Sequence, residues 1–117
     1  MQKAVVDALE DIKGRDIEVY NVTKITALFD RVVIASADST RQVNALASNV
    51  QEKLKALGCH VYGVEGADTG EWVLVDLGDI VVHVMQPAIR QYYNLEELWG
   101  AAPKVKPVKP RKAAAAA

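Results

Sequence analysis

The most informative pattern of hydrophobic and polar residues lies between Glu71 and Met85. Two alternating runs flank Leu77 and Gly78, which predicts a β-hairpin with these two residues at its turn. One face of this hairpin is wholly apolar, and the other carries an aromatic ring, an imidazole and two carboxylates. The cross-strand pairs predicted on the second face are Trp72 with His83, Leu74 with Val81, and Asp76 with Asp79.

Two interpretations of this mixed face stay open. Asp is common at hairpin turns because its carboxylate bonds to nearby backbone, and Trp72 beside His83 could simply shield the sheet. Like charges directly opposite each other are unfavourable, however, so Asp76 facing Asp79 needs a reason. Apolar and acidic groups that share one exposed patch favour a surface for recognising a partner.

The rest of the chain alternates between helical and strand patterns. Ser39 and Gln42 have the spacing of a helix-capping box, and Gly58 marks a helix end. Pro87 is suited to the first turn of a last helix, along which four residues are spaced for contacts: Arg90, Tyr93, Glu96 and Glu97. The predicted helices span 2–13, 40–57 and 87–99, and the further strands span 17–22, 31–36 and 60–65.

This order of elements predicts one α/β (α+β) domain over residues 1–100. Because the hairpin is apolar on one face, we expect a mixed, roughly five-stranded sheet with helices packed mainly on that face. Residues 101–117 are rich in Ala, Pro and Lys and lack periodicity, so they are predicted to form a disordered basic tail.

The body, residues 1–100, and the tail, residues 101–117, also differ in charge. The tail holds five of the 14 basic residues and no acid, which leaves nine basic against 15 acidic residues in the body. An acidic body favours a basic partner, whereas the tail could contact RNA. The lone Cys59 fits a reducing cytoplasm. No apolar run is long enough to span a membrane, and the first residues lack the pattern of a signal peptide.

Candidate catalytic groups are few. There is no phosphate-binding loop, and His60, His83 and Cys59 do not have the spacing of zinc ligands. Ser36, His83 and Asp76 could form a nucleophile, base and acid, but most small proteins contain such a trio. Paired carboxylates can hold a divalent metal, and the candidate set is Glu65, Asp76 and Asp79.

Several motifs together resemble the ribosomal silencing factor family, also called the Iojap-related family. They are Asp30-Arg-Val-Val-Ile-Ala-Ser36, Ser39-Thr-Arg-Gln-Val43, Val64-Glu-Gly66, the run from Trp72 to Met85, and the Tyr-Asn-Leu-Glu-Glu-Leu-Trp that ends at Trp99. The resemblance covers about residues 2–100. It implies a fold similar to that of nucleotidyltransferases without their catalysis, and no cofactor.

The resemblance further implies a cytoplasmic bacterial protein that binds the large ribosomal subunit. The family docks on ribosomal protein L-fourteen, blocks an intersubunit bridge and represses translation when nutrients are scarce. We expect Trp72 to be the anchor of this contact. The other expected contacts are Leu74, Asp76, Asp79, Val81, His83, Met85, Tyr93 and Glu96.

Two other functions stay open at this point. A nucleotide- or metal-dependent enzyme would use Glu65, Asp76 and Asp79. A dimerisation module would use the mixed face on a second copy, and a weak homodimer is compatible with ribosome binding.

Overall fold

The computed structural model describes residues 2–94 and 104–105. Within these residues, three helices and six strands follow one another, and those of the body are in the order that the sequence predicts. They are α1 (Gln2–Asp11), β1 (Arg15–Asn21), β2 (Arg31–Ser36), α2 (Thr40–Ala56), β3 (Gly63–Glu65), β4 (Trp72–Asp76), β5 (Ile80–Met85), α3 (Pro87–Tyr93) and β6 (Lys104–Val105).

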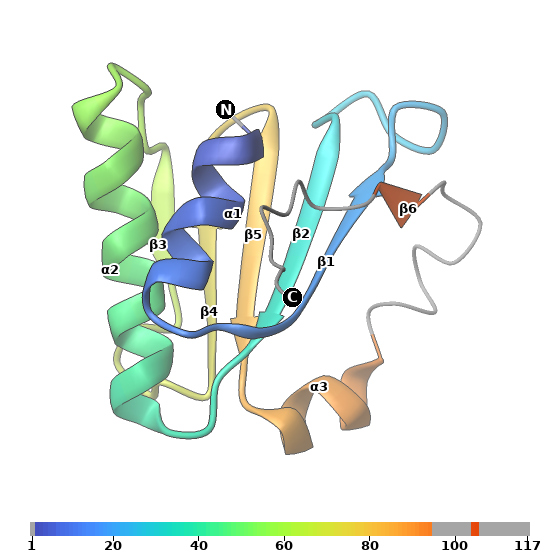
Figure 1. Cartoon of the computed structure of the whole chain (residues 1–117). Coiled ribbons are helices and arrows are strands. Elements are labelled where there is room, and N and C mark those ends of the chain that lie inside the picture. The colour runs from blue at the N-terminus through green and yellow to red at the C-terminus, as the bar shows by residue number, and fades with distance from the viewer. Residues whose placement is uncertain (1, 95–103, 106–117) are drawn as a thin grey trace, which may run out of the picture.

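The strands form one mixed sheet in the order β3-β4-β5-β2-β1-β6. The central pair, β2 and β5, is parallel, and the other neighbours are antiparallel. Helices α1 and α2 lie side by side on one face, whereas α3 lies beyond the end of the sheet where β5 finishes (Figure 1). The predicted fold class and the placement of the helices mainly on one face are therefore confirmed.

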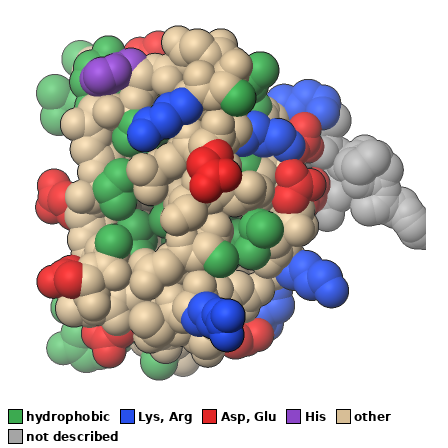
Figure 2. All heavy atoms as spheres, turned by 90° about the vertical axis from the view of Figure 1, so that its left-hand side faces the viewer, with side chains coloured by type: hydrophobic (Ala, Val, Ile, Leu, Met, Phe, Trp, Pro, Cys, Tyr) green, Lys and Arg blue, Asp and Glu red, His purple; other side chains and the backbone are tan. Residues whose placement is uncertain are grey.

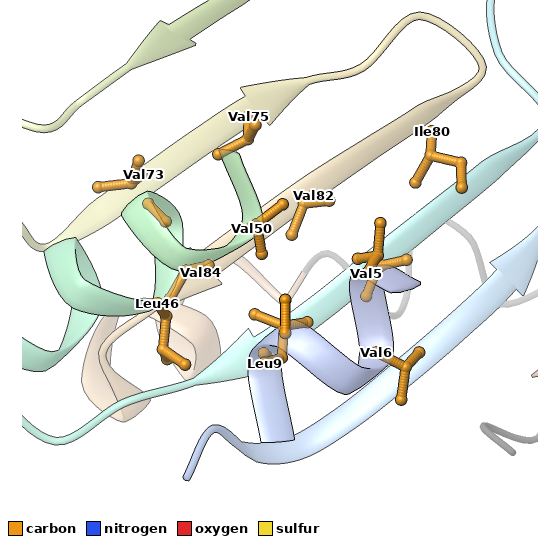
Figure 3. Packing of buried hydrophobic residues seen from close by; sticks show 14 of the residues in the cluster. Val5, Val6, Leu9, Leu46, Val50, Val73, Val75, Ile80, Val82 and Val84 are labelled. Carbon is orange, nitrogen blue, oxygen red and sulfur yellow. The ribbon is translucent and has the colours of Figure 1, made fainter. Parts of the chain in front are cut away.

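The main core lies between these two helices and the sheet. The cluster contains Leu9 of α1, Leu46 and Val50 of α2, Val73 and Val75 of β4, and Val82 and Val84 of β5 (Figure 3). All of these side chains are fully buried. The alternating pattern of the hairpin is what makes this possible, because every second residue of a strand faces the same side.

Local signals at the ends of α2 act as predicted. The Ser39 hydroxyl accepts a hydrogen bond from the backbone N–H of Gln42 at 3.1 Å. Gln42 returns the contact one residue earlier than a standard capping box, since its side chain accepts from the N–H of Asp38. At the other end Gly58 adopts φ 85°, and Cys59 N–H donates to the Leu54 carbonyl, which closes a Schellman motif.

Three predicted elements differ in the structure. Helix α3 ends at Tyr93 because Asn94 takes a left-handed conformation with φ 51°, so the predicted continuous helix is wrong at Asn94, and its remainder, 95–99, lies outside the described residues. The strand predicted from His60 begins only at Gly63. Two residues of the predicted disordered tail form β6, which pairs with β1, and the rest of 101–117 lies outside the described residues.

The hairpin turn also lies one residue later than predicted. The turn residues are Gly78 and Asp79, and Leu77 N–H donates to the Ile80 carbonyl across them. A hairpin turn of this size needs a positive φ at its first residue, which Gly78 provides at 87°. Leu77 is instead buried in the main core. Because the turn moves by one residue, each cross-strand partner moves by two, and every side chain keeps its predicted face.

No helix in the described part of the chain is long and apolar enough to cross a membrane.

Candidate partner-binding surface

The face of the sheet opposite α1 and α2 carries an aromatic pair. Trp72 lies opposite Met85, and Leu74 lies opposite His83, so the predicted pairing of Trp72 with His83 is wrong by two residues. The two rings still meet diagonally, because the Trp72 indole N–H donates to Nδ1 of His83 at 3.0 Å. Their ring centroids are 5.9 Å apart. This hydrogen bond holds the indole in one orientation.

The same hydrogen bond determines the chemical state of His83. Nδ1 accepts a hydrogen bond, so the ring is neutral and its proton is on Nε2. Burial lowers the pKa of His83 to about 4, because the charged form would lose its hydration. At neutral pH His83 is therefore an uncharged hydrogen-bonding group rather than a charge that attracts a partner.

Helix α3 adds two tyrosines to this pair. The Tyr93 ring lies 4.9 Å from that of Trp72, and Tyr92 packs edge-on against Tyr93 at 5.0 Å. Tyr93 is 53% exposed and Tyr92 is 80% exposed. We call the set of Trp72, Leu74, His83, Tyr92 and Tyr93 the aromatic surface. Tyr93, which the sequence assigned to the patch, does lie against Trp72 in the structure.

A shallow hollow of about 280 Å³ adjoins the aromatic surface, lined by Glu65, Gly66, Trp72 and Leu74. Gly66 adopts φ 88°, and a Cβ atom there would lie 2.0 Å from the Trp72 carbonyl oxygen. Only glycine allows this close approach, which fixes the loop against the start of β4. The hollow combines an apolar floor with the exposed Glu65 carboxylate at its side.

Two predicted contact residues lie beneath this surface rather than on it. Met85 is fully buried and Val81 is 8% exposed. Met85 belongs to a second core cluster with Ile34 and Tyr20, against which Trp72 and Ile89 pack. Met85 and Val81 therefore have little exposed area for direct contact with a partner.

The two carboxylates of the hairpin have separate surroundings. Asp76 lies opposite Val81, so it does not face Asp79, and the like-charge pair that the sequence predicted does not form. Asp76 Oδ1 accepts a hydrogen bond from Gly78 N–H at 2.9 Å, the local turn contact typical of this residue. The Asp79 side chain is exposed at the turn, and its carbonyl accepts from Asp30 and Arg31.

The candidate catalytic groups do not form a working arrangement. Ser36 is buried and its hydroxyl is bonded to Arg90 at 2.8 Å. The His83 nitrogen that would face an acid accepts from Trp72 instead. Among the described residues, no three His, Cys, Asp or Glu side chains are grouped so that they could hold a metal ion. This includes the set of Glu65, Asp76 and Asp79.

Sequence reasoning missed the part played by α3. The sequence pattern indicates only that Arg90 is spaced for contacts along the helix, whereas in the structure it is 8% exposed. Tyr92 was not singled out, although it is among the most exposed aromatic residues of the described chain. The sequence pattern predicts a helix here but not which of its side chains is buried, because the burial of Arg90 depends on contacts with Asp16 and Ser36. Glu96 and Trp99 lie outside the described residues.

Comparison with known proteins identifies the family. The model of the family described as "Ribosomal silencing factor during starvation" matches residues 1–117. The chain belongs to the ribosomal silencing factor family. A ribosomal silencing factor of Chromobacterium violaceum is 56% identical over 100 residues, which cover 86% of this chain and 82% of that protein.

A more distant relative and a solved structure extend the comparison. The mouse "Mitochondrial assembly of ribosomal large subunit protein 1" is 36% identical over 98 residues, covering 81% of this chain and 43% of that protein. A crystal structure of a Chromobacterium violaceum protein superposes with a TM-score of 0.83 at 53% identity, covering 98% of this chain and 91% of that one.

The family assignment confirms the resemblance read from the sequence. A ribosomal silencing factor is by name a regulator of ribosomes and not an enzyme, as the sequence predicts. The function of this family therefore requires a binding surface rather than a reaction centre, and the aromatic surface is the candidate for it.

Proposed function

We propose that this protein binds the large ribosomal subunit through the aromatic surface and thereby prevents the small subunit from joining. The observation that carries the proposal is the exposure of Tyr92 and Tyr93 beside an indole that is already held in place. Aromatic side chains with few rotatable bonds lose little entropy when a partner covers them, which suits them to be interface anchors.

The partner we propose is ribosomal protein L-fourteen, at a position where the bound protein blocks an intersubunit bridge. The mouse relative is named for assembly of the large subunit, which supports that subunit as the target. The body has an excess of acidic residues, and charge of that sign favours a basic ribosomal protein over direct contact with RNA. We place this action in the bacterial cytoplasm under nutrient limitation, where it represses translation.

Within this interface the side chains would have different roles. Trp72 and Tyr93 would be the anchors that become buried in the interface, and Leu74 would add an apolar contact beside them. His83 would keep the indole oriented. The exposed carboxylate of Asp79 and the second oxygen of Asp76 would face basic groups at the rim, where charge governs the association rate more than the final affinity. Val81 and Met85 support the anchors from below, and Glu96 would extend the patch.

Steric exclusion needs no chemistry. A folded body with a radius of gyration of 13.3 Å is large compared with the gap between two surfaces in contact. Occupation of one bridge position would therefore displace the small subunit without any conformational change in the ribosome. The strength of silencing would depend only on the affinity for the large subunit and on the concentration of the protein.

Sedimentation of ribosomal subunits tests the proposal. Purified protein is mixed with large and small subunits under conditions that favour joining, and the gradient is assayed for joined ribosomes and for the protein. We expect the protein to sediment with the large subunit and the joined fraction to fall as protein is added. Protein that stays at the top of the gradient, with joined ribosomes unchanged, would contradict the proposal.

We also propose two weaker interactions. The exposed tyrosines would allow weak self-association of the free protein through the aromatic surface. Binding to the ribosome would then displace the second copy of the protein from this surface. The basic tail would make loose contact with ribosomal RNA, so a variant ending at residue 100 should bind large subunits with a shallower dependence on salt. Equal salt slopes for the two lengths would show that the tail does not contribute.

A further inference from the structure

Helix α3 has an unusual anchor, since its one buried residue is an arginine. Pro87, Ala88 and Gln91 are exposed, as are both tyrosines, and Ile89 is only partly covered. A helix of seven residues is not stable by itself in water, so contacts with the body must hold it. Ile89 packs partly against the second core cluster, but the buried position of α3 is occupied by the Arg90 guanidinium group.

Three groups of the body surround the guanidinium of Arg90. Nη1 donates to the backbone carbonyl of Asp16 at 2.7 Å and to the hydroxyl of Ser36 at 2.8 Å. Nη2 lies 3.6 Å from Oε1 of Glu18, so the buried charge has an opposite charge beside it. Glu18 is itself held by the Tyr20 hydroxyl at 2.6 Å. A buried arginine tolerates the loss of hydration only with partners of this kind.

The backbone of β1 is shaped for this contact. Asp16 has φ 50°, a conformation that is uncommon for a residue with a side chain. The pairing register between β1 and β2 shifts between Arg15 and Glu18, which is an irregularity of the β-bulge type. Bulges turn groups out of the regular ladder, and here the Asp16 carbonyl is the group that accepts from Arg90.

Arg90 and Tyr93 lie on the same short helix, separated by less than one turn. A shift of the helix backbone at Arg90 would therefore also move the Tyr93 ring, whose centroid lies 4.9 Å from that of the Trp72 ring. The Asn94 N–H donates to the Arg90 carbonyl, so the end of the helix is also tied to this residue.

We propose that Arg90 is a positioning residue for the partner-binding surface, which holds α3 so that Tyr93 lies against Trp72. Its guanidinium joins the end of β2 and the bulge of β1 to the helix that carries the exposed tyrosines. The consequence for ribosome binding rests on the function proposed above, whereas the positioning of Tyr93 does not.

The test compares Arg90→Ala and Arg90→Lys with Arg41→Ala. Arg41 is an exposed residue in the first turn of α2 and serves as the matched control. Amide hydrogen exchange of residues 90–94 and the nuclear Overhauser effect between the Tyr93 and Trp72 rings report on α3 without any ribosome. We expect exchange in Arg90→Ala to be at least about tenfold faster and the ring contact to disappear, because local opening exposes these amides. Lysine has one ammonium and cannot reach all three partners, so Arg90→Lys should fall between the two.

A double-mutant cycle separates positioning from general stability. Arg90→Ala should weaken binding to large subunits by about tenfold in the wild-type background and have little effect when Tyr93→Ala is already present. Equal losses in both backgrounds, or α3 amides that exchange as slowly as in Arg41→Ala, would overturn the proposal. If the wild-type protein does not bind large subunits, the proposed function fails, and hydrogen exchange with the ring contact alone decides the role of Arg90.

Discussion

The two faces of the sheet differ in what their side chains do. The face beneath α1 and α2 consists of fully buried aliphatic residues, whereas the opposite face joins a smaller buried cluster to rings that remain partly exposed. The side chains of the first face are buried, so they stabilise the fold but have no exposed apolar area that a partner could cover. The second face keeps apolar area in water, and covering that area can stabilise a complex.

The outer surface around α2 supports this contrast. Seen from the side of α2 and β3, acidic, basic and hydrophobic side chains are interspersed without a large area of one kind (Figure 2). Such a mixture is typical of a surface that faces solvent. The aromatic surface, in which four rings follow one another from His83 to Tyr92, is different in kind.

The largest change in stability is expected from the helix-covered face. Leu46→Ala removes a fully buried side chain from the main core and should lower the free energy of unfolding by about 2–5 kcal/mol. Urea unfolding measures this, with Leu28→Ala as a control, since Leu28 is 82% exposed. Folded Leu46→Ala protein should bind large subunits as the wild type does. A loss below 1 kcal/mol would contradict the division between the two faces.

His83 should give the opposite face a dependence on pH. Its pKa is lowered to about 4 in the folded protein and is near 6.5 in the unfolded chain. The unfolded state therefore binds more protons between these values, and stability falls as pH falls from 6.5 towards 4. The loss attributable to His83 is about 3 kcal/mol. A protonated ring would also lose the acceptor for the Trp72 indole.

Unfolding experiments between pH 7.5 and 5 on the wild type and His83→Gln isolate this effect from that of the carboxylates. The stability difference between the two proteins should shrink or reverse as pH is lowered. Parallel pH profiles would show that His83 is not buried in the neutral form.

The smallest effect is expected at Asp76, where two changes separate its turn contact from its charge. Asp76→Ala loses the bond to Gly78 N–H and should cost about 1 kcal/mol of stability. Asp76→Asn keeps the oxygen acceptor and should retain stability, but it should weaken binding to large subunits a few-fold and flatten its salt dependence. If Asp76→Asn binds large subunits with wild-type affinity, the charge of Asp76 has no role in binding, and its only role is the hydrogen bond within the turn.

Particular residues explain which features of the fold could be predicted from the sequence and which could not. The alternation of the hairpin and the caps at Ser39 and Gly58 are local signals, so the sheet, α2 and the two faces were predictable. The exact register was not, because it depended on whether Leu77 or Gly78 begins the turn, and the burial of Leu77 decides this. The helix end at Asn94 and the burial of Arg90 depend on contacts with β1 and β2, which are distant in sequence.

The family was recognisable from its motifs, and its members are named for silencing ribosomes. Individual contact residues were less predictable, since alternation assigns a face but not a depth. Met85 and Trp72 share a face and lie opposite each other, yet one is fully buried and the other is partly exposed. Depth depends on the neighbours of each side chain: Met85 lies in a cluster with Tyr20 and Ile34, and Trp72 and Ile89 pack against that cluster.

The affinity of Trp72→Ala for isolated large subunits tests the central claim most directly. Leu28→Ala, which removes an exposed leucine far from the aromatic surface in sequence, is the matched control, and unfolding measurements verify that both variants are folded. Loss of an anchor costs about 2 kcal/mol or more, so we expect Kd to rise at least about 30-fold for Trp72→Ala and to stay unchanged for Leu28→Ala. A folded Trp72→Ala protein that binds with wild-type affinity would show that the aromatic surface is not the docking site.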